Sequence, residues 1–270
     1  MNDLRRELAP VTDRAWAEIE AESRNVLRTH LAGRKVVDLR EPLGWQASSV
    51  GTGRTRPVEP APVDGVELRM RRVQPLVEIR VPFTVDREEL DSIDRGADDG
   101  NLDPVTDAAR RLALVEDQLV FYGGSGADIT GICSRTGGES LSFDEDYASF
   151  PDLVARSLEI LKGSNVEGPY RLVLGPEAHQ GLSRTRSVGG YPVINHVRRL
   201  IDGPTVWTAA IEGAVLLSIR GGDFELVLGR DVSIGYRDHT RDGVELYLEE
   251  SLTFRLLNPE AAVPILPHGA

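Results

Sequence analysis

The sequence predicts an α+β fold, because clear helices and clear strands are interspersed without the regular strand–helix–strand order of a parallel α/β protein. Two strands are indicated by strict alternation of apolar and polar residues, over 73–85 and 244–256. Two long helices are indicated by apolar residues at helical spacing, over 12–32 and 104–122. A further segment, 45–72, fits neither pattern.

The predicted helices have recognisable end signals. Thr12 is placed to cap the first helix and Gly33 to end it. Asp86 begins a short helix through an Asp-x-x-Glu capping box, and Gly96 ends that helix. Asp103 is the expected cap of the second long helix. The first helix is expected to bury Trp16, Ile19, Ser23, Val26, Leu27 and Leu31. The second long helix is expected to bury Val105, Ala108, Ala109, Leu112, Val115, Leu119 and Val120.

The alternating strands each predict one buried face. The first is expected to bury Val73, Val77, Ile79, Val81, Phe83 and Val85. In the final strand Glu250 alone interrupts the apolar side, which indicates either a β-bulge or a polar contact at an interface. Shorter elements complete the prediction, with helices over 151–162 and 192–201 and strands over 171–174, 214–219, 224–228 and 232–236.

Residues 45–72 predict a long two-stranded arm. The segment is poor in large apolar side chains, and three prolines and the Asp64-Gly65 turn interrupt it in the middle. An isolated hairpin is only marginally stable in water. The arm therefore needs another surface to lie on, and the sequence offers none within the same fold. The alternative is a structureless loop, which is uncommon at this length.

Composition excludes several classes of protein. The chain of 270 residues has a formal net charge of −12, whereas nucleic-acid binding depends on clustered cations. No apolar run approaches the ~20 residues of a membrane helix. The first residues have no apolar signal-peptide region, and Cys133 is the only cysteine. We therefore expect a cytoplasmic protein that binds neither nucleic acid nor a membrane and has no disulfide or thiolate metal site.

The sequence contains no recognisable catalytic constellation. The run Gly123-Gly124-Ser125-Gly126-Ala127 lacks the last glycine of a nucleophile elbow and follows a helix rather than a strand. There is no phosphate-binding glycine loop, and no two of the five histidines are spaced at i, i+4 as in a zinc motif. An enzyme is therefore the minority hypothesis, and no metal site is expected.

Stretches along nearly the whole chain are similar to one protein family. They are residues 8–10, 16–19, 33–38, 82–86, 89–91, 95–96, 167–170, 220–224, 229–236, 250–254 and 258–260. In this order they resemble the encapsulins, the linocin-like shell proteins of bacterial and archaeal nanocompartments. Each stretch alone would be a weak signal, whereas the combination is specific.

The resemblance implies the tailed-phage major capsid fold. It assigns 1–44 to the N-terminal helix and the start of the P-domain, 45–72 to the E-loop, 73–130 to the P-domain with its spine helix, 131–222 to the A-domain and 223–270 to the last P-domain strands. The family forms icosahedral homo-oligomers, at this chain length most often of sixty subunits. The missing partner of the arm is then a neighbouring subunit.

The resemblance also implies a cargo. Encapsulin shells enclose enzymes, typically dye-decolorising peroxidases or ferritin-like proteins, that carry a C-terminal targeting peptide. The peptide lies between the N-terminal helix and the P-domain. The matching positions are Leu31, Arg34, Val37, Asp38, Asp231, Val232, Ile234 and Tyr236. They combine apolar sockets with polar groups, as an extended peptide requires, although core packing would also explain Val37 and Ile234.

Two further expectations come from the family. The loop matching its five-fold pore comprises Ser183, Arg184, Thr185, Arg186, Ser187, Val188, Gly189, Gly190 and Tyr191. Its arginines would attract anions, whereas the simpler interpretation is a solvated loop. Some encapsulins bind flavin through an aromatic residue where this chain has Arg87, so no flavin or other cofactor is expected. The alternative function within the same fold is a phage or prophage capsid protein.

Overall fold

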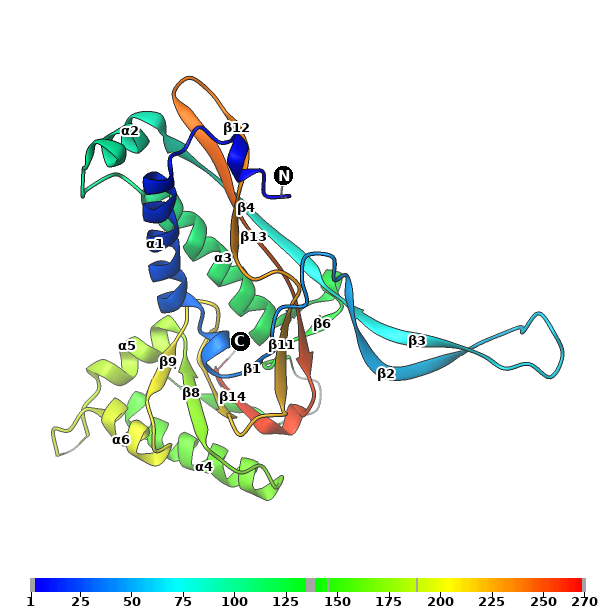
Figure 1. Ribbon diagram of the computed structural model, residues 1–270. Coiled ribbons are helices and arrows are strands. Elements are labelled where there is room, and N and C mark those ends of the chain that lie inside the picture. Colours follow the sequence, from blue (N-terminus) through cyan, green and yellow to red (C-terminus); the bar gives the residue numbers. More distant parts are fainter. Residues whose placement is uncertain (1–2, 135–138, 145, 188, 269–270) are drawn as a thin grey trace.

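A computed structural model describes residues 3–134, 139–144, 146–187 and 189–268. It consists of a two-part body from which one long hairpin projects (Figure 1). The first part of the body is a five-stranded sheet with two long helices, and the second is another five-stranded sheet with three shorter helices. Within these described ranges, no helix combines the length and the apolar character needed to cross a lipid bilayer.

The central strand of the first sheet is β13 (Gly243–Leu256). One edge pairs antiparallel with β4 (Val77–Asp86). Along its other edge, the first part of β13 pairs with β12 (Ser233–His239) and the last part pairs with β11 (Phe224–Leu228). Strand β11 also pairs in parallel with β1 (Asp38–Leu39). The alternation predicted for the last strand is therefore confirmed, and it places β13 in the middle of the sheet.

Helices α1 (Asp13–His30) and α3 (Asp103–Phe121) pack against each other beside this sheet (Figure 1). The hydroxyl of Thr12 accepts a hydrogen bond from Ala15 N at 3.2 Å, which confirms the predicted cap. All six residues expected on the buried face of α1 are buried. The helix ends before the expected Gly33, which instead begins a single 3₁₀ turn, η2 (Gly33–Lys35).

The prediction for α3 was partly wrong. Asp103 is its first helical residue and no side chain caps it. Val115 is 37% exposed, while Glu116 and Asp117 next to it are buried, because this part of the helix faces charged groups of η2 and β13 rather than apolar ones. Helix α2 (Arg87–Arg95) begins and ends as predicted, with Asp86 as its cap.

The second sheet has the order β7 (Leu141–Phe143), β14 (Ala262–Pro267), β10 (Ala214–Ser218), β8 (Tyr170–Leu174) and β9 (Thr205–Trp207). Its helices are α4 (Phe150–Gly163), α5 (Pro176–Arg184) and α6 (Val193–Leu200). The sequence predicted α4, α6, β8 and β10 but missed α5 and β14. The remaining short strands are β5 (Gly123–Gly124) and β6 (Ile129–Thr130).

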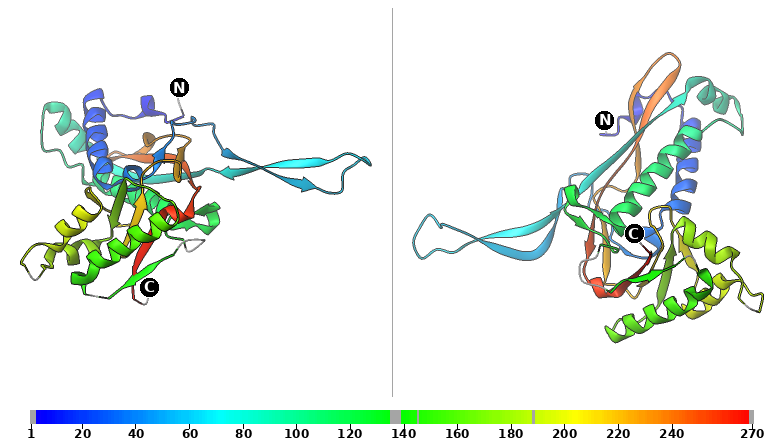
Figure 2. Two further views of the ribbon diagram at one scale, coloured as in Figure 1. Left: turned by 90° about the horizontal axis from the view of Figure 1, so that it is seen from below. Right: turned by 180° about the vertical axis from the view of Figure 1, so that it is seen from behind.

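The projecting hairpin confirms the predicted two-stranded arm. Strand β2 (Ser49–Val58) pairs antiparallel with β3 (Leu68–Pro75), and both views of Figure 2 show the pair standing away from the body. The expected single strand over 73–85 is wrong, because its first residues belong to the arm and Val73 is 54% exposed. The arm ends just after Pro75, where Leu76 N donates to the Ser48 carbonyl at 2.9 Å, and β4 then pairs with β13 instead of β2.

Candidate functional site

A cavity of about 610 Å³ lies between the second half of α1 and the start of β12. Five of the eight residues predicted for peptide binding line it, namely Leu31, Arg34, Asp231, Val232 and Ile234. The remaining lining residues are Leu4, Arg6, Glu20, Ser23, Arg24, Leu27, Arg28, Lys35 and Ser233. The two predicted segments, almost 200 positions apart, therefore do meet at one hollow, which we call the groove.

The other three predicted residues lie outside the groove. Val37 and Asp38 line a neighbouring hollow of about 180 Å³ to which Arg34 also contributes. The Asp38 carboxylate accepts a hydrogen bond from Gly222 N at 2.5 Å, so it holds a turn. Tyr236 is buried further along β12, where its backbone N–H donates to the carbonyl of Leu4 at 2.9 Å. That bond joins the N-terminal segment to the edge of the sheet.

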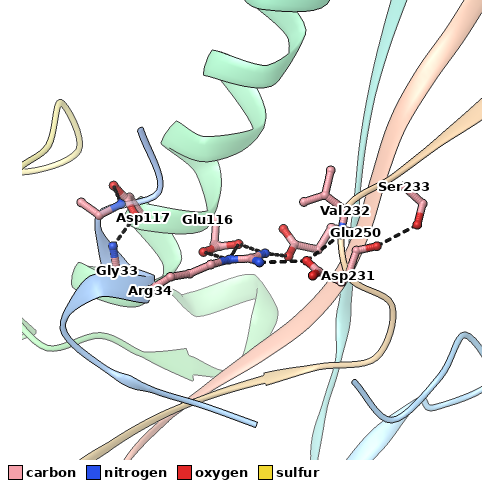
Figure 3. Close-up of polar contacts among 9 residues, drawn as sticks. Gly33, Arg34, Glu116, Asp117, Asp231, Val232, Ser233 and Glu250 are labelled. Atoms are coloured by element: carbon pink, nitrogen blue, oxygen red, sulfur yellow. Dashed lines mark hydrogen bonds and ion pairs between the residues drawn. The ribbon is translucent and has the colours of Figure 1, made fainter. Parts of the chain in front are cut away.

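Arg34 is held in the floor of the groove by carboxylates from three elements (Figure 3). Its Nε donates to both oxygens of Glu116 at 3.0 Å, and its Nη1 donates to Asp231 at 2.8 Å. Its Nη2 donates to Glu116 at 2.7 Å and also to Glu250. All three guanidinium nitrogens are therefore engaged within the chain, and only 16% of the side chain is exposed.

The cluster is electrostatically coupled. Burial alone would lower the pKa of Arg34, but the hydrogen bonds to Glu116 and the charges of Glu250 and Asp231 outweigh it and raise that pKa. Burial, followed by the charge of Glu116, raises the pKa of Glu250 well above its usual range, and Arg34 offsets this only in part. Among the described residues the second carboxylate oxygen of Glu250 has no hydrogen-bond partner. Both effects favour a protonated Glu250.

Glu250 therefore corrects the sequence interpretation. No bulge interrupts the β13–β4 ladder here, because Glu249, Glu250 and Ser251 pair with successive residues of β4. The register shift lies in β12 instead, between Tyr236 and Asp238. The carboxylate faces Arg34 of the same chain rather than an interface between chains. The glutamate on the apolar side of β13 therefore belongs to a buried polar cluster around Arg34.

Asp117 holds the backbone between Leu31 and Arg34, two residues that line the groove. Its carboxylate accepts hydrogen bonds from Gly33 N at 2.8 Å, Ala32 N at 3.2 Å and the Thr208 hydroxyl at 2.6 Å. Burial raises the pKa of Asp117 to about 6, although these three bonds act in the opposite direction. Sequence reasoning missed both Glu116 and Asp117. The available signal was the position of Glu116 four residues after Leu112, on the predicted apolar face of the helix.

The predicted pore loop lies far from the groove, between α5 and α6 (Figure 1). Ser183 and Arg184 are the last two residues of α5, and the hairpin-like turn is closed by Ser187 N donating to the Tyr191 carbonyl at 2.9 Å. Apart from Thr185, the described residues of this loop are exposed, whereas Val188 falls outside the described residues. The two arginines are thus placed on a solvated surface of the second sheet region.

The described residues contain no group of three or more His, Cys, Asp or Glu side chains arranged to hold a metal ion. Cys133 is buried, and burial raises the pKa of its thiol to about 12. Ser125 lies in a short 3₁₀ turn directly after β5.

Comparison with known proteins gives a consistent result. A family model described as "Encapsulating protein for peroxidase" matches residues 1–253. The chain is 52% identical over 270 residues to the type 1 encapsulin shell protein of Rhodospirillum rubrum, covering 98% of this chain and 96% of the relative. It is 46% identical over 265 residues to the type 1 encapsulin shell protein of Mycobacterium tuberculosis, covering 98% and 99%.

Solved structures support the fold alone. A virus-like particle from Pyrococcus furiosus has a TM-score of 0.63 at 19% identity, covering 92% of this chain and 97% of the other. The capsid of an empty GTA particle has a TM-score of 0.57 at 13% identity, covering 87% and 89%, and a structure of Mycobacterium phage Bobi has a TM-score of 0.56 at 13% identity, covering 89% and 91%. The expected tailed-phage major capsid fold is confirmed.

Proposed function

The chain belongs to the family of encapsulating proteins for peroxidase, and from that premise we propose that it is the shell subunit of an encapsulin nanocompartment. The shell would be a closed icosahedral homo-oligomer of sixty copies in the cytoplasm. It would enclose a dye-decolorising peroxidase or a ferritin-like protein through the C-terminal targeting peptide of that cargo. The subunit would act structurally rather than as an enzyme, and with Arg87 at the aromatic position it would bind no flavin.

The observation that carries the assembly proposal is the arm. Strands β2 and β3 pair only with each other, and most of their residues are exposed on both faces. A two-stranded ribbon is marginal by itself, so the arm requires a surface that this chain does not supply. A neighbouring copy supplies such a surface in a closed shell.

The groove supports the cargo proposal. Its walls combine the apolar side chains of Leu31, Val232 and Ile234 with charged groups at the rim. An extended peptide needs this combination, because apolar sockets provide affinity and polar groups set the register. The pore loop between α5 and α6 would then line an opening in which Arg184 and Arg186 attract anions.

The test of assembly is the size and content of the purified particle. We expect closed, megadalton shells by electron microscopy and light scattering. Because each copy has a formal charge of −12, the shells should contain little nucleic acid. Stable monomers at physiological salt would refute the shell. If the ratio of nucleic-acid to protein absorbance stayed as high as that of a filled virion after nuclease treatment, the phage capsid alternative would be favoured. The structural likeness to phage proteins is limited to the fold.

The test of the groove is cargo loading. The probe is a fluorescent protein fused to the C-terminal segment of a dye-decolorising peroxidase or ferritin-like protein from the same genome. Val232→Asp places a charge in an apolar socket, which costs on the order of 1–3 kcal/mol, or roughly ten- to a hundredfold in affinity. Leu257→Asp is the control, because it places the same charge on an exposed apolar residue outside the groove. Equal loading in intact shells of both variants would remove the groove from the proposal.

A further inference from the structure

Two exposed arginines lie on the groove wall formed by α1. Arg24 and Arg28 are one helical turn apart, both are exposed and both line the groove. Among the described residues, neither side chain forms a hydrogen bond, an ion pair or a stacking contact. Residues at i and i+4 lie on the same face of a helix, so the two guanidinium groups can reach one ligand.

The remaining charges of the groove are compensated within the chain, except for one lysine. Arg6 pairs with Glu20 at 2.6 Å and lies over the ring of Trp16. Arg34 is saturated by carboxylates, including Asp231 on the opposite wall. Lys35 donates to the Thr29 carbonyl at 2.9 Å, which leaves its charge unneutralised. The α1 side of the groove is therefore positive, although the chain as a whole is strongly negative.

The sheet edge opposite these arginines suits an extended peptide. Tyr236 of β12 donates its backbone N–H outward to Leu4, so the same edge presents the backbone of Ile234, two residues earlier. A peptide strand can add to such an edge, with its side chains alternating between the two walls. An occupant of the groove would thus lie between a backbone template and two free guanidinium groups.

Paired guanidinium groups favour a carboxylate, because their N–H donors match its two oxygens in a forked geometry. The α-carboxylate is the only anionic group that every C-terminal peptide has, whatever its sequence. Resting on the proposed function, we propose that Arg24 and Arg28 form a clamp for the terminal carboxylate of the bound peptide. The clamp selects peptides that end inside the groove over the same sequence continued beyond it.

The experiment is a competition between two reporters co-expressed with the shell protein. A green reporter ends at the natural terminus of the targeting segment, and a red one has the same segment followed by a Gly-Ser-Gly tail. Wild-type shells should contain roughly tenfold more of the natural-end reporter, and exchanging the two colours should not alter the preference. In Arg24→Gln/Arg28→Gln shells the preference should vanish. Arg14→Gln, an exposed arginine of α1 outside the groove, is the matched control and should keep it.

Each alternative outcome is informative. Equal loading of the two reporters into wild-type shells, or an unchanged preference in the double variant, would overturn the clamp. A further control replaces the acidic side chains of the targeting segment with Asn or Gln. If the double variant then no longer changes the preference between the two reporters, its ligand is an acidic side chain and the terminal carboxylate is excluded. The assignment of the groove to cargo, on which the clamp rests, fails separately when Val232→Asp shells load normally. If Val232→Asp shells are empty while Arg24→Gln/Arg28→Gln shells keep the preference for the natural-end reporter, only the clamp is refuted.

Discussion

Arg34 and Glu116 are 82 positions apart in the sequence, yet their side chains meet at 2.7 Å beneath the groove, where the carboxylate of Glu116 is fully buried. The pair connects the turn after α1 to the middle of α3. Asp231 and Glu250 add contacts from the strands, so the same guanidinium fixes both walls of the groove. Arg34 is therefore a structural residue of the groove floor rather than a free contact for a ligand.

Replacing Arg34 should destabilise the subunit. Arg34→Ala leaves Glu116 and Glu250 buried without a cation, and breaking a buried pair in this way typically costs about 3–5 kcal/mol. The loss should be smaller at acidic pH, where the carboxyl groups are protonated. Calorimetric unfolding of assembled shells at two pH values measures both effects.

The matched variant is Arg34→Ala/Glu116→Gln. It removes one of the orphaned charges, so it should unfold at a higher temperature than Arg34→Ala alone. If Arg34→Ala unfolded like the wild type at neutral pH, the cluster would not contribute to stability.

Asp117 should make the subunit more stable in mild acid. Its native pKa is about 6 against 3.8 in a free carboxyl group, so the native state binds the proton more tightly. The free energy of unfolding therefore rises as the pH falls from 7 to about 4, by up to about 3 kcal/mol. Above the native pKa the full cost of burying the ionised carboxylate is present. Asp117→Asn cannot titrate, so its unfolding free energy should depend less steeply on pH. Identical slopes for the two proteins would contradict the assignment.

The arm should be required for assembly but not for the fold of the body. Deleting residues 54–66 removes exposed apolar side chains such as Val63 and Val66, which are 61% and 48% exposed, and leaves both sheets intact. We expect small species by light scattering with an unchanged circular dichroism spectrum. Leu68→Ser/Met70→Ser keeps both strands and should weaken assembly less. Normal shells from the deletion variant would show that the arm is dispensable.

Cys133 should be inert in the folded protein. Burial keeps its thiol protonated, with a pKa of about 12, and the thiolate is the reactive form. A thiol reagent at pH 8 should label native shells very slowly and label denatured chains at once. The labelling rate should follow unfolding as denaturant is added. Fast stoichiometric labelling of native shells would mean that the residue is accessible.

The periodicity of single elements was readable from the sequence, because it depends on neighbours a few residues away. The buried face of α1, the alternation of β13 and the unsupported arm all follow from local spacing and composition. Resemblance to a family added the two segments that meet at the groove. The sequence could not locate the break between β3 and β4, because the partner of Val73 in the arm was unknown.

The roles of the charged residues were decided only by the tertiary structure. Arg34, Glu116, Asp231 and Glu250 come from four separate parts of the chain, and none of them has its partner nearby in sequence. Periodicity predicts which side of an element faces inward, but not which residue lies opposite. A buried charge is stabilised only by the groups around it, so whether Arg34 was neutralised and Arg24 and Arg28 left free depended on how distant segments pack.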